Sequence, residues 1–499
     1  MSDVIHIIPR DETHVVVRGP LNPLLELQNH LTFEVPGARF RPAFQAGFWD
    51  GKIRLFSPYT PVLYKGLVRE AATFFGRLGY QVNVDPSLAP RGLAYAGKDA
   101  ELMEWASSVT SDEFEDREYQ LTSFVKAVLR DRCILLSSTS SGKTLMMYRL
   151  ARFYVEKEGK PALLVTTRIN LVAQMEKDFA RYSPDPISVH TIMAGSEKNV
   201  KADYVITTWQ SAVRMPPEWF EQFSVICADE VHNWDAKKLT EIMGRVGTTP
   251  YRFGFSGTLK DSKNSELTLV GLFGSIIRVS RTKERIEAGD TAGLRIIGVQ
   301  LKWPEADRAK VYRGGVNKHG KSCPMNYVQE MDYIIGSEAR QNAIVDYVSR
   351  LEGNVMILFN RNDKYGKPLF EKLRNRFGER AMLVYGETNV AERELVRVRM
   401  AERSDVVALA SLGTFSEGFS ADDLRHVVLA YPLKSQVRLM QSVGRVLRRA
   451  KGKTEGVFHD FTDDMRYKSH ENYSWRHFLH RLEIYDEEEL AYEVSTVTL

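Results

Sequence analysis

Three short segments contain residue types that nucleotide chemistry requires, and the first is a candidate phosphate site. The segment CILLSSTSSGKTLMMYRL has the pattern of a buried strand, a turn of small residues and a helix, and Ser141, Gly142, Lys143 and Thr144 lie where the turn enters the helix. Backbone N–H groups at such a helix N-terminus cradle phosphate oxygens. Lys143 would reach the β- and γ-phosphates, and the hydroxyl of Thr144 would bind Mg²⁺. The strict pattern has glycine where Ser137 stands, so an ordinary strand–turn–helix connection with a surface lysine is the alternative.

The second segment, SVICADEVH, ends an apolar run with two carboxylates, Asp229 and Glu230. In a parallel sheet, a carboxylate at the C-terminal end of a strand is placed to bind the Mg²⁺ of a nucleotide. We expect Asp229 to hold the metal through its water shell and Glu230 to orient and deprotonate the attacking water. The alternative is an acidic pair that begins a solvated loop, but the position downstream of the phosphate site favours catalysis.

The third segment, QSVGRVLR, contains Gln441, Arg445 and Arg448. On a helix these three residues lie on one face. Two arginines on one face can reach a γ-phosphate across a domain cleft and stabilise the charge that develops in phosphoryl transfer, an effect worth roughly 10³-fold or more. The alternative is a helix whose cations are solvated.

Near the N-terminus, the segment ARFRPAFQAGFWDGKIRLF alternates aromatic residues with cations. This composition suits base stacking together with phosphate attraction, and Arg41 and Trp49 are its candidate nucleic-acid contacts. In the alternative, the aromatic residues form the core of a small domain and the cations lie on its solvated face. The turn from Trp49 to Lys52 also has the pattern of a plain hairpin.

These sites need a scaffold that brings the ends of several strands together. Short aliphatic runs, most of them followed by a helical pattern, recur between residues 133 and 258 and again between 354 and 461. Strands that alternate with helices predict a parallel sheet with crossover helices on both faces. We therefore expect an α/β protein with two consecutive halves of similar length, bridged by the segment from about 260 to 335.

The expected domain boundaries follow from these sequence patterns. Residues 1–95 form a small α+β domain, residues 96–275 the first α/β half, residues 276–470 the second, and residues 471–499 a C-terminal helical tail.

Composition sets mild limits on function. The chain has 68 basic and 64 acidic residues and a net charge of +4, which permits nucleic-acid binding without locating it. The cysteines Cys133, Cys227 and Cys323 show no metal-ligand spacing and favour a reducing, intracellular compartment. The N-terminus does not have the pattern of a secretory signal, and no apolar run approaches the roughly 20 residues that span a bilayer. We expect no membrane partner and a cytoplasmic location.

Taken in order, the motifs resemble those of superfamily 2 helicases. STSSGKT is similar to motif I, VTTRINLVAQ to motif Ia, TTWQS to motifs Ib–Ic, ADEVH to the DExH box of motif II and FSGTL to motif III. VMILFN is similar to motif IV, ASLGTFSEGFS to motif V and QSVGRVLRR to motif VI. The resemblance implies two tandem RecA-like parallel-sheet domains with ATP and Mg²⁺ bound between them, preceded by the small α+β domain.

The resemblance also implies roles for individual residues. Gln120 looks like the adenine-reading glutamine, and Ser140 and Gln441 join the nucleotide-binding set. Coupling of hydrolysis to strand movement is implied for His232, Ser256, Thr258 and Gly418. Contacts with the nucleic-acid backbone are implied for Thr167, Arg168, Thr208, Trp209, Gln210, Asn360, Arg361 and Thr414. Hydroxyls, amides and cations suit phosphate contacts, which position a strand without reading its sequence.

A closer resemblance is to the UvsW family of recombination and repair helicases from tailed phages. Its motif I has the form T-S-[AS]-G-K-[ST], and its N-terminal domain contains a run similar to ARFRPAFQAGFWDGKIRLF. The resemblance implies an ATP-dependent DNA helicase or translocase in the host-cell cytoplasm that acts as a monomer on branched, single-stranded and duplex DNA. The implied activities are junction branch migration, fork regression, unwinding of R-loops and strand annealing. RNA would be a partner only within R-loops.

Three alternatives stay open. An RNA helicase would share every motif. A motor subunit of a larger restriction or repair complex would depend on a partner. A binding-only scaffold would have lost Lys143, Asp229, Glu230 or Arg445, and all four are present.

Overall fold

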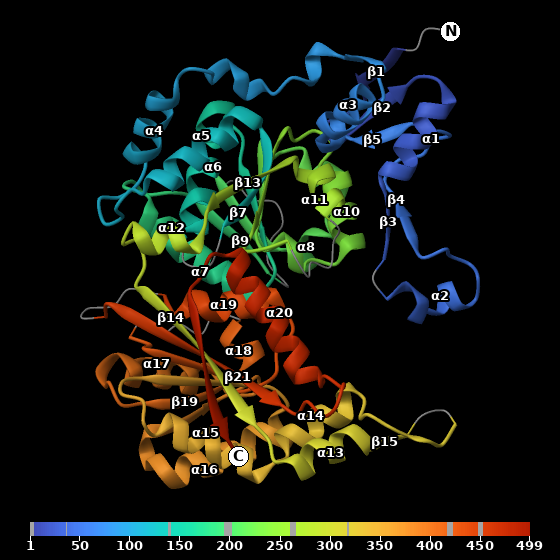
Figure 1. Ribbon diagram of the computed structural model, residues 1–499. Helices are drawn as coiled ribbons and strands as arrows, with labels where there is room; N and C mark the ends of the chain where they lie inside the picture. The colour runs from blue at the N-terminus through green and yellow to red at the C-terminus, as the bar shows by residue number, and fades with distance from the viewer. Residues whose placement is uncertain are drawn as a thin grey trace. The chain divides into compact units, whose positions relative to one another are not determined.

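Figure 1 shows the computed structural model, which describes residues 4–35, 37–137, 141–193, 202–259, 266–316, 319–416, 423–447 and 453–499. The chain divides into two compact units, the first made of residues 1–137 and 142–279 and the second mainly of residues 280–499. Among the described residues, no helix is long and apolar enough to cross a membrane.

The first unit begins with a small α+β module built on a four-stranded sheet of order β5-β2-β1-β6. Its strands are β1 (Val4–Pro9), β2 (His14–Arg18), β5 (Val62–Tyr64) and β6 (Gln81–Val84). Alternate residues of β1 and β2 are buried, as expected for strands with one face on a core. Helices α1 (Leu21–His30) and α3 (Val68–Arg77) supply apolar residues to the same core.

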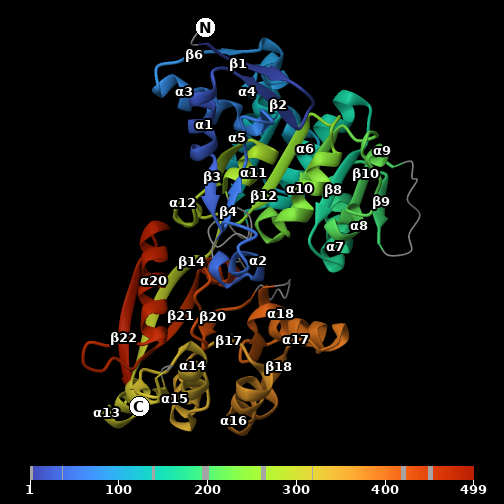
Figure 2. The ribbon, with the colours of Figure 1, turned by 90° about the vertical axis from the view of Figure 1, so that its right-hand side faces the viewer.

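A two-stranded arm extends from this module (Figure 2). Strands β3 (Thr32–Glu34) and β4 (Lys52–Arg54) pair antiparallel, and the residues between them include η1 (Ala38–Phe40) and α2 (Pro42–Gln45). The predicted hairpin at Trp49–Lys52 is wrong, because these residues lead into β4 and the connection between the paired strands is much longer.

Short 3-10 segments and two helices join the arm module to the first large domain. They are η3 (Pro86–Leu88), η4 (Arg91–Tyr95), α4 (Asp99–Ser108) and α5 (Glu118–Arg130). A further 3-10 segment, η2 (Lys65–Leu67), lies inside the small module and leads into α3. The aromatic rings of Trp105 and Phe124 stack with centroids 5.7 Å apart, which packs α4 on α5.

The first large domain has a seven-stranded sheet of order β13-β7-β12-β11-β8-β10-β9. Its strands are β7 (Arg132–Ser137), β8 (Ala162–Thr166), β9 (Val189–Ile192), β10 (Tyr204–Thr208), β11 (Val225–Ala228), β12 (Tyr251–Ser256) and β13 (Ser275–Ser280). The helices are α6 (Lys143–Glu158), α7 (Ile169–Tyr182), α8 (Trp209–Ala212), α9 (Pro217–Phe220), η5 (Val231–Asn233), α10 (Ala236–Arg245) and α11 (Glu266–Phe273). Strands β8, β10 and β11 are buried along their whole length because the sheet is covered on both faces.

Glu12 links the small N-terminal α+β module, from which the arm extends, to this domain. Its carboxylate lies 2.6 Å from Lys65 Nζ, 2.8 Å from Arg91 and 3.6 Å from Arg132. Burial opposes ionisation of Glu12, but the three cations hold its pKa below the usual value. Residues of α11 also pack against the module core, so module and domain form one unit.

The second unit has a seven-stranded sheet of order β18-β19-β17-β20-β21-β14-β22, in which neighbouring strands run parallel. Its strands are β14 (Gly293–Lys302), β17 (Val355–Phe359), β18 (Ala381–Val384), β19 (Val407–Ser411), β20 (His426–Leu429), β21 (Glu455–Asp464) and β22 (Tyr492–Thr498). A separate short ribbon pairs β15 (Gly315–Val316) with β16 (Ser322–Cys323). This α/β architecture of two parallel sheets confirms the predicted fold class.

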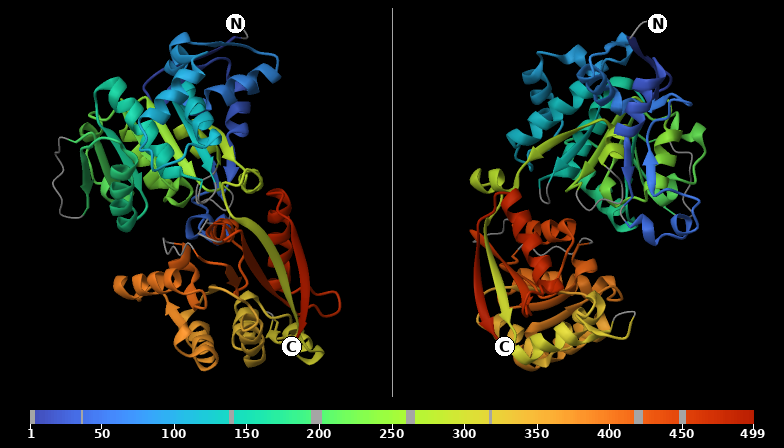
Figure 3. Two further views of the ribbon diagram at one scale, coloured as in Figure 1. Left: turned by 90° about the vertical axis from the view of Figure 1, so that its left-hand side faces the viewer. Right: turned by 45° about the vertical axis from the view of Figure 1, so that its right-hand side comes forward.

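The helices of the second unit lie in the connections between successive strands of its sheet (Figure 3). They are α12 (Thr282–Glu287), α13 (Glu305–Arg313), α14 (Tyr327–Ile335), α15 (Glu338–Val348), η6 (Asn362–Gly366), α16 (Lys367–Phe377), η7 (Gly378–Arg380), α17 (Val390–Glu402), α18 (Leu412–Ser416), α19 (Gln436–Val446) and α20 (Tyr473–Glu487).

Two expectations about this unit need correction. The bridging segment is not only a connection, because its residues 293–302 form β14 inside the second sheet. The tail is not wholly helical, because residues 492–498 form the edge strand β22 beside β14. Pairing with a strand nearly 200 positions earlier decides the structure of this polar segment, and local pattern cannot reveal such pairing.

Buried ion pairs fasten α20 and α15 to β21. Arg481 of α20 lies 2.8 Å from Asp460, and Arg340 of α15 lies 2.7 Å from Asp463. All four side chains are inaccessible to solvent. Each arginine also donates to a backbone carbonyl, Arg481 to Leu433 and Arg340 to Ala430. Such pairs fix orientation, since removing one partner leaves an uncompensated buried charge.

Candidate nucleotide site and nucleic-acid interface

Ser141 and Gly142 directly precede α6, and Lys143 and Thr144 are its first two residues, at the helix entry that the sequence predicts. Gly142 precedes α6 with φ of +81°, in the left-handed region that favours glycine. A Cβ on Gly142 would lie 2.3 Å from Nε2 of Gln120, so the buried Gln120 amide of α5 lies directly against the loop. Ser140 is outside the described residues. Thr144 is half-buried in the first turn of α6.

Asp229 and Glu230 follow β11, and Glu230 contacts the phosphate-loop lysine. Lys143 Nζ donates to Glu230 Oε1 at 2.6 Å, and both side chains are mostly buried. Glu230 has φ of +47°, and its backbone N–H donates to Asp229 Oδ1 at 2.9 Å. A non-glycine residue with positive φ at the end of a strand is a local strain that surrounding structure must hold.

Electrostatics give the two carboxylates opposite properties. Burial raises the pKa of Asp229 to about 7, with a further contribution from the Glu230 charge. Burial also opposes ionisation of Glu230, but Lys143, with His232, holds the pKa of that carboxyl below its usual value. The pKa of Lys143 is raised, because Glu230 and Asp229 outweigh burial. Two adjacent carboxylates whose pKa values are pushed apart are typical of catalytic sites.

The donor set fits a magnesium ion that arrives with a nucleotide. No group of three or more His, Cys, Asp or Glu residues that could hold a metal occurs in the part of the chain that the structure describes. Mg²⁺ usually takes only one or two protein oxygens and completes its shell with phosphates and water. Asp229 is a half-buried carboxylate with a raised pKa, a state that an adjacent cation would relieve. Thr144 and Asp229 are therefore suitable ligands.

His232 connects the carboxylates to the segment after β12. Its Nδ1 lies 2.8 Å from Ser256 Oγ and 3.2 Å from Glu230 Oε2. The Ser256 hydroxyl in turn donates to the backbone carbonyl of Thr258 at 2.6 Å. The residues predicted to couple hydrolysis to movement in the first domain thus form one continuous chain of contacts from Glu230 to Thr258.

In the second unit, Arg445 lies on α19 and is largely buried, with its guanidinium carbon 5.2 Å from the centroid of the Phe415 ring. This contact joins α19 to α18, the segments similar to motifs VI and V. Arg448 and Gly418 lie outside the described residues, and so does the side chain of Gln441.

The nucleic-acid candidates in the large domain of the first unit gather at the carboxyl edge of its sheet. Strands β8 and β10 pair so that Thr166 is opposite Thr208, and the residues that follow both strands are therefore neighbours. Gln210 Nε2 donates to the Thr167 carbonyl at 3.5 Å. Arg168 and Gln210 are exposed, Thr167 and Trp209 are half-buried, and Thr208 is buried with its hydroxyl accepting from the backbone N–H of Ser211.

The nucleic-acid candidates of the second unit differ in how accessible their side chains are to a phosphate. Asn360 is exposed directly after β17. Arg361 has φ of +64° and forms an ion pair with Asp332 of α14, so a phosphate must compete with that carboxylate for it. Thr414 is buried, and its hydroxyl lies 2.8 Å from that of Ser411. Charge pairing and burial of these two residues could not be read from the motifs.

The aromatic residues of the arm lie outside any core, which overturns the alternative in which they pack inside a small domain. Phe40 is 70% exposed, Phe48 89% and Phe44 37%. The guanidinium of Arg41 lies 5.7 Å from the Trp49 ring centroid, and that of Arg39 lies 4.8 Å from the Phe40 ring. Arg41 is exposed and Trp49 half-buried, with its indole N–H donating to the Lys52 carbonyl at 2.8 Å.

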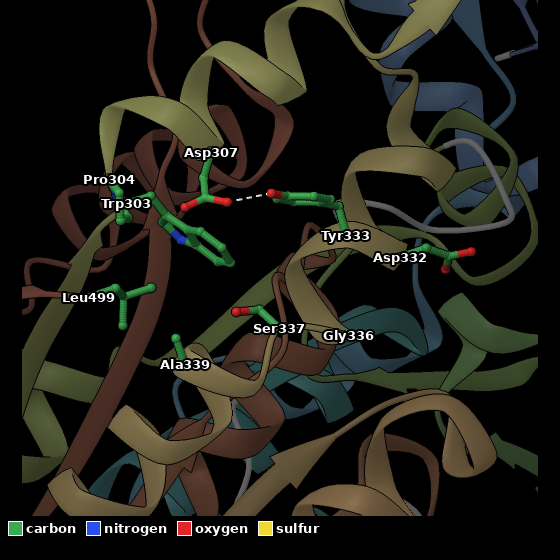
Figure 4. Close-up of a pocket in the computed structure, with 9 residues that line it drawn as sticks. All are labelled: Trp303, Pro304, Asp307, Asp332, Tyr333, Gly336, Ser337, Ala339 and Leu499. Carbon is green, nitrogen blue, oxygen red and sulfur yellow. Dashed lines mark hydrogen bonds between the residues drawn. The ribbon is translucent and has the colours of Figure 1, made fainter.

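Two cavities of the second unit were not predicted from the sequence. One, of about 440 Å³, is lined by Trp303, Asp307, Asp332 and Tyr333, and the Tyr333 hydroxyl donates to Asp307 (Figure 4). The other, of about 520 Å³, is lined by Tyr327, Lys434, Tyr473, Arg476, His477 and His480. Their linings come from segments far apart in the sequence and belong to no motif.

Comparisons with known proteins agree with this geometry. Three family models match: "DNA helicase UvsW, N-terminal" at residues 4–85, "Type III restriction enzyme, res subunit" at residues 113–261 and "Helicase conserved C-terminal domain" at residues 339–450. The ATP-dependent DNA helicase uvsW of Enterobacteria phage T4 is 31% identical over 98% of this chain and 98% of its own length. The probable helicase D10 of Escherichia phage T5 is 23% identical over 66% of this chain and 67% of its own length.

Solved structures give the same result. The crystal structure of T4 UvsW aligns with 100% of both chains at 28% identity and a TM-score of 0.53. A fragment of a putative HsdR subunit of a type I restriction enzyme from Vibrio vulnificus covers 90% of this chain and 88% of its own, at 15% identity and a TM-score of 0.58. At that identity the second likeness concerns the fold alone.

Proposed function

Since the chain belongs to the UvsW family of phage ATP-dependent DNA helicases, we propose that it acts on branched DNA in recombination and repair. The proposed activities are junction branch migration, fork regression, R-loop unwinding and strand annealing. The proposed ligands are ATP, Mg²⁺ and branched, single-stranded or duplex DNA, with RNA only as part of an R-loop, and the enzyme acts as a monomer in the cytoplasm of the host cell.

Nucleotide binding switches the Lys143–Glu230 pair. Lys143 donates to Glu230 at 2.6 Å. The phosphates of ATP compete for Lys143, and this competition releases Glu230 to accept a proton from the attacking water. Asp229 and Thr144 would hold Mg²⁺, which would supply neutralisation of phosphate charge. Arg445 and Arg448 are proposed to stabilise the γ-phosphate charge, and Gln120 and Gln441 to bind the nucleotide.

The release of Glu230 also changes the contacts of His232. Its Nδ1 lies within 3.2 Å of Glu230 and 2.8 Å of Ser256, so a change at either partner alters the other. We propose that the series of contacts from Glu230 through His232 and Ser256 transmits the state of the nucleotide to Thr258 and the DNA-facing loops. Such a device is a local change of contacts that biases a larger movement.

The observation that carries the preference for branched DNA is the arm. Phe40 and Phe48 are exposed, and the guanidinium of Arg39 lies over the Phe40 ring; exposed rings stack on unpaired bases and cations attract phosphates. Unpaired bases are abundant where strands diverge and rare in plain duplex. The cations and amides after β8, β10 and β17 would hold the backbone without reading sequence.

Two other functions are distinguished by the same experiment. An RNA helicase would share the motifs, and a motor subunit of a restriction or repair complex would need a partner for activity. Family membership and the exposed arm favour DNA and an independent enzyme.

The test is steady-state ATP hydrolysis with no nucleic acid, single-stranded DNA, duplex DNA, a four-way junction or RNA. We expect the junction to stimulate hydrolysis more than plain duplex or RNA. The variant Phe40→Ala/Phe48→Ala should lose the junction preference, whereas exposed Tyr59→Ala on the same module should keep it. Equal or greater stimulation by RNA supports the RNA helicase, and absence of stimulation supports the subunit.

A further inference from the structure

The larger of the two cavities described above lies beside the first turns of α20. Its volume is about 520 Å³, within the range of roughly 300–1,000 Å³ that small ligands occupy. It is lined by Tyr327 from α14, Lys434 from the segment before α19, and Tyr473, Arg476, His477 and His480 from α20. Among the described residues, the lining contains aromatic rings and cations and no carboxylate.

Two carboxylates near this cavity already have partners. Glu330 accepts the backbone N–H groups of Tyr473 and Ser474, both at 2.9 Å. Glu483 lies 3.2 Å from His480 Nδ1. Lys434 and Arg476 are both exposed, so their charges face solvent at the cavity. An anion that approaches meets two cations with no competing carboxylate in the lining.

The aromatic rings are arranged for contact with a flat group. The ring of Tyr327 meets that of Tyr473 edge to face with centroids 5.6 Å apart, and it lies 5.6 Å from the His477 ring. The guanidinium of Arg476 covers the Tyr473 ring at 4.3 Å. Rings in this arrangement leave apolar surface for a further planar partner.

One polar atom of the lining is buried without a partner. His477 Nδ1 has no hydrogen-bond partner among the residues that the structure describes. Burial, with Arg481 and Lys434, lowers the pKa of His477 to about 4, so its ring is neutral at physiological pH. A neutral imidazole offers one donor and one acceptor, and buried polar atoms of this kind usually have a partner.

The cavity walls are held rigidly. Arg481, one turn after His477 on α20, is locked to Asp460 by hydrogen bonds of 2.9 Å from Nε to both carboxylate oxygens. Its guanidinium also donates to the carbonyl of Leu433, next to Lys434. The same arginine therefore fixes α20 and the Lys434 segment relative to each other, which is the preorganisation that a binding site needs.

We propose that this cavity binds one unpaired nucleotide of single-stranded DNA, with the base against Tyr327 and His477 and the phosphate on Lys434 and Arg476. The inference rests on the proposed action on DNA and adds a place in the second unit where a displaced strand is held. Stacking on aromatic rings and attraction of phosphate to cations suit sequence-independent binding.

The smaller cavity, seen in Figure 4, is also lined by residues of α14 but differs in charge. Asp307 and Asp332 line it, together with Trp303 and Tyr333. Aromatic rings are common to both cavities, but carboxylates repel a phosphate. The sign of the charge therefore distinguishes the cavity at Tyr327 as the one for DNA.

The test is fluorescence-anisotropy titration of the full-length protein with a labelled thymidine oligonucleotide at several salt concentrations. Lys434→Ala/Arg476→Ala should bind about tenfold more weakly and reduce the salt slope by roughly 1.4, or about 0.7 for each lost phosphate contact. The matched control Arg374→Ala/Arg376→Ala removes two exposed cations from α16 and should keep wild-type affinity and slope.

A second measurement isolates the base. An oligonucleotide with abasic sites should bind the wild type about tenfold more weakly than the intact one. Tyr327→Leu should lose this discrimination and Tyr327→Phe should keep it, because the phenyl ring stacks without the hydroxyl. Thermal unfolding of all variants shows whether a loss of binding reflects a loss of structure.

The outcomes separate this proposal from the proposed function. Unchanged affinity and slope in the Lys434/Arg476 variant, or equal abasic discrimination in Tyr327→Leu and Tyr327→Phe, would overturn the cavity site while junction-stimulated hydrolysis of the wild type stands. If no DNA stimulates the wild type, the proposed function fails whatever the cavity binds.

Discussion

Replacement of Glu230 by glutamine tests the central inference about catalysis. The change removes one negative charge, keeps the shape of the side chain and leaves Lys143 with Asp229 as its acidic neighbour. Because an amide cannot accept the proton of the attacking water, we expect turnover to fall by about 10²–10⁴-fold, the usual contribution of a general base. ATP should still bind, because Lys143, Gly142 and Thr144 are intact.

The structure also gives the size of the effect on stability. At an effective dielectric constant of about 20, two charges 2.6 Å apart attract by roughly 6 kcal/mol, and desolvation of both groups cancels much of this. Losing one partner of a buried pair costs about 3–5 kcal/mol. Asp229 remains beside Lys143 and its pKa should fall, so we expect a smaller loss of about 1–2 kcal/mol in the free energy of unfolding.

Three measurements check these expectations. Steady-state hydrolysis gives turnover, equilibrium binding of a fluorescent ATP analogue gives affinity, and urea unfolding gives stability. The matched control is Glu218→Gln on α9, which is exposed and should behave as the wild type in all three. Wild-type turnover by Glu230→Gln would refute the assignment of the general base, and loss of ATP binding would refute the separation of binding from chemistry.

Further predictions concern metal, coupling and domain attachment. Because burial raises the pKa of Asp229 to about 7, Mg²⁺ must displace a proton at lower pH, and its affinity should fall about tenfold per pH unit below that value; calorimetric titration that finds no pH dependence contradicts this. His232→Ala should raise the ATP consumed per base pair unwound by a larger factor than it lowers the rate of ATP hydrolysis. Adding Ser256→Ala to this variant should cause no further change, and additive changes in the double variant would show that the two residues act separately. Glu12→Gln should lower the free energy of unfolding by about 1–3 kcal/mol at neutral pH, and the difference should vanish in acid, because a carboxylate with a lowered pKa stabilises the fold only while ionised. Urea unfolding at both pH values checks this, and a pH-independent difference counts against the ion pairs.

The sequence was most informative where chemistry and local pattern coincide. Lys143 and Glu230 lie 87 positions apart, yet each follows a buried strand, and parallel strands bring their carboxyl ends to one edge of a sheet. The fold class followed from the same alternation of strands and helices. Gln120 needed the family resemblance, because nothing in its own helix distinguishes it from other buried polar residues.

Other features could not be predicted because long-range partners decide them. The pairing of Arg361 with Asp332 depends on the packing of α14 near the end of β17. The exposure of Phe40 and Phe48 depends on an arm that reaches beyond the module core, whereas aromatic residues in short strands usually fill such a core. The cavity at Tyr327 is assembled from three separate segments, and no periodicity encodes it.

The order of strands in the second sheet has a consequence for how the protein is made. β14 lies between β21 and β22 and pairs with both over most of its length, but the ribosome produces β14 more than 150 residues before either partner. Until residues 455–498 emerge, both edges of β14 remain open, and open edges recruit other chains. The first sheet, by contrast, has all its strands once residue 280 is made. A stalled or shortened nascent chain should therefore fold its first half and aggregate through its second, so the quality of recombinant protein depends on the integrity of its last fifty residues or so.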